Sequence, residues 1–275
     1  MNRQACCGFT LIELVVLLVI SGVLASISSG FITMPAKAYI DLSRRAALVD
    51  TAELALRRMQ RDIRRALPNS IRITAGGSTI EMLHSVDGGR YRRKKAGDGS
   101  GDVLEENTAD SSFDVIGTLD NFSAVDTAND QLVIYNIGAG LGNAYRSSGS
   151  NNRATLTSSS SATSIHFSSK QFPWYSPQQR FFIIDTPVTY RCDTTPAAAK
   201  NRTLRRYDQY AISQIQQDPP PVTGKIQANY LSACNFSYQQ GTASRSGLVT
   251  VELMLTDDSG ESVRLLHQIH VDNLP

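Results

Sequence analysis

The chain has 275 residues, of which 41% are hydrophobic, 27 are Lys or Arg and 25 are Asp or Glu, so its formal net charge is +2. This length suffices for one sizeable globular domain and a further long helix. The near-neutral charge argues against nucleic acid or an anionic surface as an obligate partner, because such partners are usually matched by a strongly basic chain.

The first three dozen residues combine a short polar head with a long apolar run. Residues 8–13 read Gly-Phe-Thr-Leu-Ile-Glu, and only apolar and small polar residues follow from Leu14 to Ile32. An ionised side chain in a bilayer core is expensive, so the carboxylate of Glu13 needs a partner or a purpose. An ordinary secretory signal, with a weak cleavage site at residues 25–27, would leave Glu13 unexplained. A plain membrane anchor would leave it equally unexplained.

Residues 8–13 and the apolar run resemble the signature of type IV prepilins, which the pseudopilins of type II secretion systems share. The resemblance implies that residues 1–8 are a leader, which prepilin peptidase removes after Gly8. It also implies methylation of the new terminal amine at Phe9. In this family the residue at the position of Glu13 neutralises the terminal amine of a neighbouring subunit during assembly. Two opposite charges buried together relieve each other's desolvation, which agrees with this role.

The same resemblance implies a fold, a location and partners. The fold is α+β and type IV pilin-like, with residues 9–33 as a transmembrane and assembly helix and residues 68–275 as a β-rich periplasmic head. The implied partners are prepilin peptidase, other major and minor pilins, and the inner-membrane pilus assembly platform. The chain would start as a single-pass inner-membrane protein and end in the pilus at the cell surface.

Helical periodicity continues through residues 34–67, which we predict to be an amphipathic helix. Pro68 ends it after Leu67, and Gly30 and Pro35 predict a kink or local melting at the end of the membrane part. Apolar residues recur at intervals of three and four, which marks one face: Tyr39, Leu42, Ala46, Val49, Ala52, Leu56, Met59, Ile63 and Ala66.

The opposite face of this helix is rich in arginine and acidic residues. Pairs such as Glu53 with Arg57 and Arg58 with Asp62 are spaced four residues apart, as in a solvated helix face. A contact surface for acidic patches on neighbouring subunits is the alternative.

Residues 68–275 are predicted to be rich in β-strands. The clearest hairpin is the last, because apolar residues alternate along Val249–Leu255 and Val263–Val271 on either side of a turn at Asp257–Gly260. One face of this hairpin needs a cover, and the amphipathic helix is the candidate. The other predicted strands are Ser70–Thr74, Thr79–His84, Phe113–Ile116, Gln131–Asn136, Ala154–Thr157, Thr163–Ser168, Arg180–Asp185, Pro187–Cys192, Thr203–Tyr207 and Tyr230–Tyr238.

Residues 85–112 are predicted to be a loop with a cluster of basic side chains. The cluster is a candidate contact for DNA or for a surface, which would make the protein an adhesin. Five charges give a small electrostatic footprint, so a solvated loop is the alternative. Its members are Arg90, Arg92, Arg93, Lys94 and Lys95.

Two of the four cysteines, Cys6 and Cys7, would leave with the leader, so Cys192 and Cys234 remain as a pair. A domain exported to an oxidising compartment favours a disulfide between them. A metal site is the alternative, but it lacks further ligands at suitable spacing.

No arrangement of residues predicts catalysis or a cofactor. The four histidines are scattered, and no nucleophile elbow is present. The turn at residues 257–261 carries three carboxylates that could hold Ca²⁺ weakly, although it lacks the loop spacing of an EF-hand. We expect a substrate of an enzyme, not an enzyme.

Several stretches resemble the O-type minor pilins of the MSHA (mannose-sensitive haemagglutinin) pilus. This resemblance implies a low-abundance subunit that takes part in assembly, with a place in a tip complex. A J-type pseudopilin of a type II secretion system and a W-type minor pilin are the alternatives. The stretches are residues 66–72, 89–92, 110–115 and 133–136.

Overall fold

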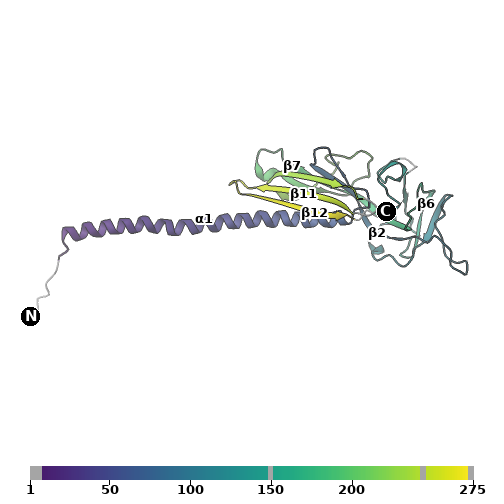
Figure 1. Cartoon of the computed structure of the whole chain (residues 1–275), viewed down its shortest axis with the longest axis horizontal. Helices are drawn as coiled ribbons and strands as arrows, with labels where there is room; N and C mark the ends of the chain where they lie inside the picture. The colour runs from purple at the N-terminus through teal and green to yellow at the C-terminus, as the bar shows by residue number, and fades with distance from the viewer. Residues whose placement is uncertain (1–7, 148–150, 242–245, 272–275) are drawn as a thin grey trace, which may run out of the picture. The chain divides into compact units, whose positions relative to one another are not determined.

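The computed structural model describes residues 8–147, 151–241 and 246–271. The chain forms two compact units, Met1–Ala47 and Leu48–Pro275. Helix α1 (Leu11–Arg64) contributes its first part to one unit and its last part to the other (Figure 1).

Helix α1 is uninterrupted, so the predicted local melting near Gly30 and Pro35 is wrong. A proline removes only one backbone hydrogen bond, and the strong helix formers Ala36, Lys37 and Ala38 follow it. The α-helix ends at Arg64, three residues before the predicted end.

The end of α1 is set by a strand. The amide of Leu67 donates to the carbonyl of Leu83 (2.8 Å), and the amide of Ser85 donates to the carbonyl of Arg65 (2.8 Å). The amides of Arg65 and Ala66 still donate back into the helix, to the carbonyls of Arg61 (3.2 Å) and Ile63 (3.2 Å), so the chain leaves the helical hydrogen-bond pattern at Leu67, before Pro68 is reached.

The strands form three antiparallel sheets in the described part of the chain. One sheet has the order β1-β2-β7-β4-β5, with β8 pairing with β7 and with β9. A second has the order β10-β11-β12, and β3 pairs with β6 in the third. The bounds are β1 (Arg72–Ile73), β2 (Thr79–Arg90), β3 (Asp110–Asp114), β4 (Gln131–Ile134), β5 (Arg153–Thr155), β6 (Ser164–Lys170), β7 (Arg180–Asp193), β8 (Thr203–Tyr207), β9 (Lys225–Asn229), β10 (Leu231–Gln239), β11 (Gly247–Thr256) and β12 (Ser262–Val271). Short 3-10 helices lie at Phe122–Ala124, Gly140–Gly142 and Ala199–Asn201.

Most of the predicted strands are present, with boundaries shifted by a few residues, and β9 was missed. The two strands predicted at residues 180–185 and 187–192 are one strand, β7. Pro187 lies inside it, opposite Leu83, where the register with β2 shifts. A strand tolerates a proline at such an irregularity, because the regular ladder of hydrogen bonds is already interrupted there and does not need the N–H that proline lacks.

The loop predicted at residues 85–112 is wrong at both ends, because β2 continues to Arg90 and β3 begins at Asp110. Gly88 and Gly89, which lie in this predicted loop, pair with Phe182 and Phe181 of β7. A Cβ on Gly88 would lie 3.0 Å from the carbonyl oxygen of Phe181, and one on Gly89 would lie 3.1 Å from that ring. These glycines make room for aromatic neighbours inside a strand.

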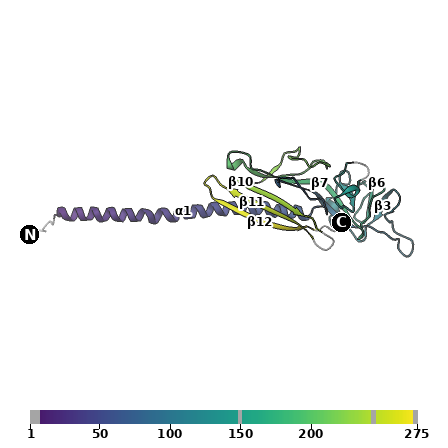
Figure 2. The same cartoon turned by 45° about the horizontal axis from the view of Figure 1, so that its top comes forward.

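The last part of α1 packs under both larger sheets, as predicted for the final hairpin. Ala52, Leu56, Met59 and Ile63 are buried in one core with the apolar residues of β11, such as Val251. Figures 1 and 2 both show β11 and β12 alongside this part of the helix.

Three residues of the predicted apolar face do not join this core, namely Tyr39, Leu42 and the exposed Ala46. Tyr39 and Leu42 are exposed, with 74% and 68% of their surfaces accessible. Helical periodicity identifies a face, but it does not reveal whether the same chain covers that face.

The predicted ion pair between Arg58 and Asp62 is also wrong. The carboxylate of Asp62 instead accepts hydrogen bonds from the hydroxyl of Tyr190 (2.8 Å) and from Nε of Arg206 (2.7 Å). Arg58 donates to Gln227. This side of the helix therefore contacts the sheet through polar groups, whereas the predicted pair of Glu53 and Arg57 is present (3.0 Å).

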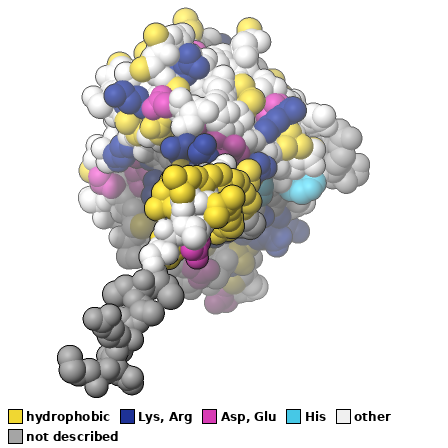
Figure 3. All heavy atoms as spheres, turned by 90° about the vertical axis from the view of Figure 1, so that its left-hand side faces the viewer, with side chains coloured by type: hydrophobic (Ala, Val, Ile, Leu, Met, Phe, Trp, Pro, Cys, Tyr) yellow, Lys and Arg dark blue, Asp and Glu magenta, His cyan; other side chains and the backbone are white. Residues whose placement is uncertain are grey.

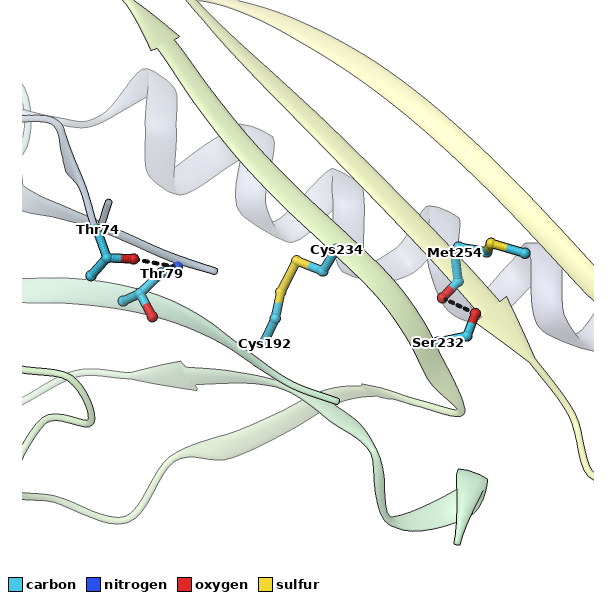
Figure 4. Close-up of a disulfide and its surroundings, with 6 residues drawn as sticks. All are labelled: Thr74, Thr79, Cys192, Ser232, Cys234 and Met254. Carbon is cyan, nitrogen blue, oxygen red and sulfur yellow. Dashed lines mark hydrogen bonds between the residues drawn. A yellow bond between two sulfur atoms is a disulfide. The ribbon is translucent and has the colours of Figure 1, made fainter. Parts of the chain in front are cut away.

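The predicted disulfide between Cys192 and Cys234 is present, with 6.3 Å between the Cα atoms. It joins β7 of the large sheet to β10 of the three-stranded sheet, and the helix runs behind it in the view of Figure 4. A backbone hydrogen bond from Phe236 to Gly77 (2.8 Å) adds a second link between the same two sheets.

Removing this disulfide should destabilise the head strongly. The two cysteines are 42 residues apart, and closing a loop of that length stabilises a fold by about 4 kcal/mol in the chain-entropy model. We expect the Cys192→Ala/Cys234→Ala variant, or the reduced chain, to unfold at a lower denaturant concentration, measured by circular dichroism. An unchanged midpoint would show that packing alone holds the sheets together.

Asp130 predicts a pH dependence of stability. Burial raises the pKa of its carboxyl to about 6, and the charges of Asp185 and Asp126 act in the same direction. The folded state therefore holds this proton more tightly than the unfolded state, so stability falls as pH rises from about 4 to about 6, by on the order of 2 kcal/mol. Asp130→Asn keeps an acceptor for the amide of Asp126 and should remove this fall, as measured by denaturation across that range.

Asp126→Asn is the matched control, because hydrogen bonds from Asn129 and Ala128 lower the pKa of Asp126. The stability from Asp126 is present at neutral pH and is lost as pH drops through its pKa. Its replacement should therefore lower stability at neutral pH, opposite in sign to Asp130→Asn. If both variants shift stability the same way, the assignment of the pH dependence to Asp130 is wrong.

Candidate assembly site

The predicted cleavage site lies just before helix α1. Gly8 and Phe9 are exposed and outside regular secondary structure, and Phe9 has 73% of its surface accessible. A Cβ added to Gly8 would meet no atom within 4 Å among the residues that the structure describes. The fold of this chain therefore does not require glycine at position 8. Of the predicted leader, residues 1–7, including Cys6 and Cys7, lie outside the described residues.

Thr10 caps the helix, a role that the sequence reasoning missed. The amide of Glu13 lies 3.4 Å from the Thr10 hydroxyl oxygen and 3.1 Å from its carbonyl oxygen, and the amide of Leu14 donates to the same carbonyl (3.2 Å). A threonine followed three residues later by a glutamate is the sequence pattern of a capping box, so this role of Thr10 could have been predicted from the sequence.

Glu13 has a local structural role in addition to any role between subunits. Its carboxylate lies in the first turn of α1, where the positive end of the helix dipole favours a negative charge. Its side chain is exposed. An exposed carboxylate at a helix start, next to the predicted new terminus at Phe9, is accessible to a positive group of another molecule.

The first turns of α1 expose apolar side chains on every side. Each described residue from Leu11 to Ile27 is exposed, including Leu17, Ile20 and Leu24 with about half of their surfaces accessible. Figure 3 shows hydrophobic side chains gathered around this end of the helix. A helix that is apolar all round is normally buried, so this segment requires a cover. Among the described residues, no helix reaches both the length and the apolarity needed to cross a membrane.

The five residues of the predicted basic cluster are not equivalent. Arg90 is exposed at the end of β2, and Lys94 and Lys95 are exposed beyond it. Arg93 pairs with Glu106 (2.7 Å), and Nε of Arg92 lies 3.5 Å from a carboxylate oxygen of Asp114. The neighbouring carboxylates offset two of the five charges, which weakens the cluster as an anion-binding surface.

No metal site forms within the parts of the chain that the structure describes, where no three His, Cys, Asp or Glu side chains gather. In the turn at residues 257–261, the carboxylate of Asp257 accepts hydrogen bonds from the amides of Ser259 (2.8 Å) and Glu261 (2.9 Å). His84 lies beside Asp185 (3.0 Å). These contacts stabilise the fold locally.

The comparison with family profiles returned one match, described as "Prokaryotic N-terminal methylation motif", over residues 3–29. The chain carries this motif. It supports a type IV prepilin-like protein, and it implies processing by a prepilin peptidase and assembly with other pilins. It is consistent with a membrane-anchored pilin that ends up in the pilus. No curated protein and no solved structure matched the chain.

Proposed function

We propose that this protein is a minor pilin, a structural subunit of a type IV pilus of the MSHA type. The observation that carries the proposal is the methylation motif over residues 3–29, in which Leu11 to Ile27 form the exposed apolar start of helix α1. The four stretches that resemble O-type MSHA minor pilins support the particular system. A non-enzymatic role without a cofactor is part of the proposal, as is a place in the complex at the pilus tip.

In this proposal the chain first sits in the inner membrane with its head in the periplasm. Residues 9–33 are apolar or small apart from Glu13, which is the composition of a single membrane pass. The disulfide between Cys192 and Cys234 agrees with a head in an oxidising compartment.

Assembly then moves the apolar helix from lipid into the filament. Prepilin peptidase cleaves after Gly8, the amine of Phe9 is methylated, and the inner-membrane assembly platform adds the subunit to other pilins. The carboxylate of Glu13 pairs with the terminal amine of a neighbouring subunit, which offsets the cost of burying either charge alone.

Fractionation of cells that express the chain tests this proposal. The processed chain should appear in sheared pili at low abundance on an immunoblot, and the Gly8→Ala variant should be absent from them. Deletion of the gene should reduce piliation. If the chain stays with the cells and its deletion stops protein secretion instead, it is a J-type pseudopilin.

A further inference from the structure

A polar pocket in the head has the composition of an anion-binding site. It has a volume of about 590 Å³ and lies where β5 meets β6, with contributions from β4. Arg153 and Lys170 line it, and the described residues of its lining include no aspartate or glutamate. It is separate from the helix start and from the basic cluster.

The guanidinium of Arg153 is held in place by neutral groups. Nη1 donates to the side-chain oxygen of Gln131 (2.7 Å), and Nη2 donates to the carbonyl of Arg146 (3.0 Å). Nε is buried without a hydrogen-bond partner, and Arg153 forms no ion pair with the described residues. The charge is therefore fixed in position, and no carboxylate of the described residues forms an ion pair with it.

The ammonium of Lys170 is positioned beside this guanidinium. Its Nζ donates to Oδ1 of the buried Asn151 (3.0 Å), and the same oxygen accepts from the backbone amide of Arg153 (3.1 Å). Burial lowers the pKa of both side chains, and the charge of Arg153 lowers the pKa of Lys170 further. An anion between them would relieve this repulsion.

One carboxylate of the neighbouring strand is opposite Lys170 in register. Asp110 of β3 pairs with Lys170 across the strands. Its oxygens accept hydrogen bonds from the backbone amides of Glu105 (2.8 Å) and Ser111 (2.7 Å). Asp110 does not line the pocket.

The remaining lining groups indicate what carries the anion. Hydroxyl and amide side chains dominate, among them Ser147, Thr155, Ser169 and Gln171. The volume lies in the range of small-molecule sites, so it exceeds what a bare inorganic ion needs. We propose that this pocket binds a small, hydroxyl-rich molecule that carries a carboxylate or a phosphate group, the chemistry of an acidic sugar.

Titration calorimetry on the full chain in neutral detergent micelles tests the proposal. The probes are glucuronate, glucose 6-phosphate, glucose and inorganic phosphate. At least one charged sugar should bind saturably and at least about tenfold more tightly than glucose, since a hydrogen bond to a charged group is stronger than one between neutral groups. Comparison of the affinities for glucuronate and glucose 6-phosphate shows whether the pocket prefers a carboxylate or a phosphate group.

Matched variants assign the binding to this pocket. Arg153→Gln and Lys170→Gln should each weaken it about tenfold or more, whereas Lys200→Gln, at an exposed site in a 3-10 helix, should leave it unchanged. If Arg153→Gln does not fold, as judged by circular dichroism, Lys170→Gln decides. The proposal is overturned if no charged sugar binds better than glucose, if inorganic phosphate binds equally tightly, or if a folded Lys170→Gln variant binds normally.

Discussion

Replacing Gly8 by alanine should leave the chain uncleaved and unmethylated, and so keep it out of the pilus entirely. An added methyl group meets no atom of the described residues, so the fold of that part of the chain does not account for the loss. The requirement for glycine must come from the active site of the peptidase, which has to fit the backbone closely. Immunoblot mobility and mass spectrometry of the N-terminus measure cleavage and methylation at Phe9.

Gly22→Ala is the matched control for this prediction. Gly22 is also exposed with open space around it, but it lies within α1 and beyond the motif residues 8–13. The Gly22→Ala chain should be cleaved after Gly8 and methylated at Phe9 normally. If Gly8→Ala is trimmed like the control, the prepilin assignment loses its main support.

Replacing Glu13 by valine should leave cleavage intact and prevent incorporation into pili. Removing one partner of a buried ion pair leaves the other charge buried without compensation, at a cost of about 3 to 5 kcal/mol. That cost corresponds to a loss of more than a hundredfold in assembly equilibrium. The measurement is the ratio of processed chain in sheared pili to processed chain in membranes.

Two further variants separate the charge of Glu13 from its place in the helix cap. Glu13→Gln keeps a side chain that a capping box accepts but has no charge, so it should fail to assemble as Glu13→Val does. Thr10→Ala removes the capping hydroxyl, which weakens the helix start by about 1 kcal/mol, but it keeps the charge. It should therefore assemble better than either Glu13 variant. Normal piliation with Glu13→Gln would exclude charge neutralisation as the role of Glu13.

The sequence alone determined the local features of this protein. The motif at residues 8–13, the long helix and the final hairpin depend on neighbouring residues and on periodicity, which a single sequence displays. The disulfide could also be predicted, because Cys192 and Cys234 were the one pair left after the leader. Thr10 could have been identified in the same way from the capping-box pattern.

Only the tertiary structure decided which partners the side chains and backbone groups find across the fold. Asp62 contacts Tyr190 and Arg206 rather than its helical neighbour, and Gly88 and Gly89 lie in a strand because aromatic rings face them. Arg153 and Lys170 are 17 residues apart in the sequence, yet they line one pocket. Long-range contacts of this kind depend on how the sheets pair and pack, so local pattern does not predict them.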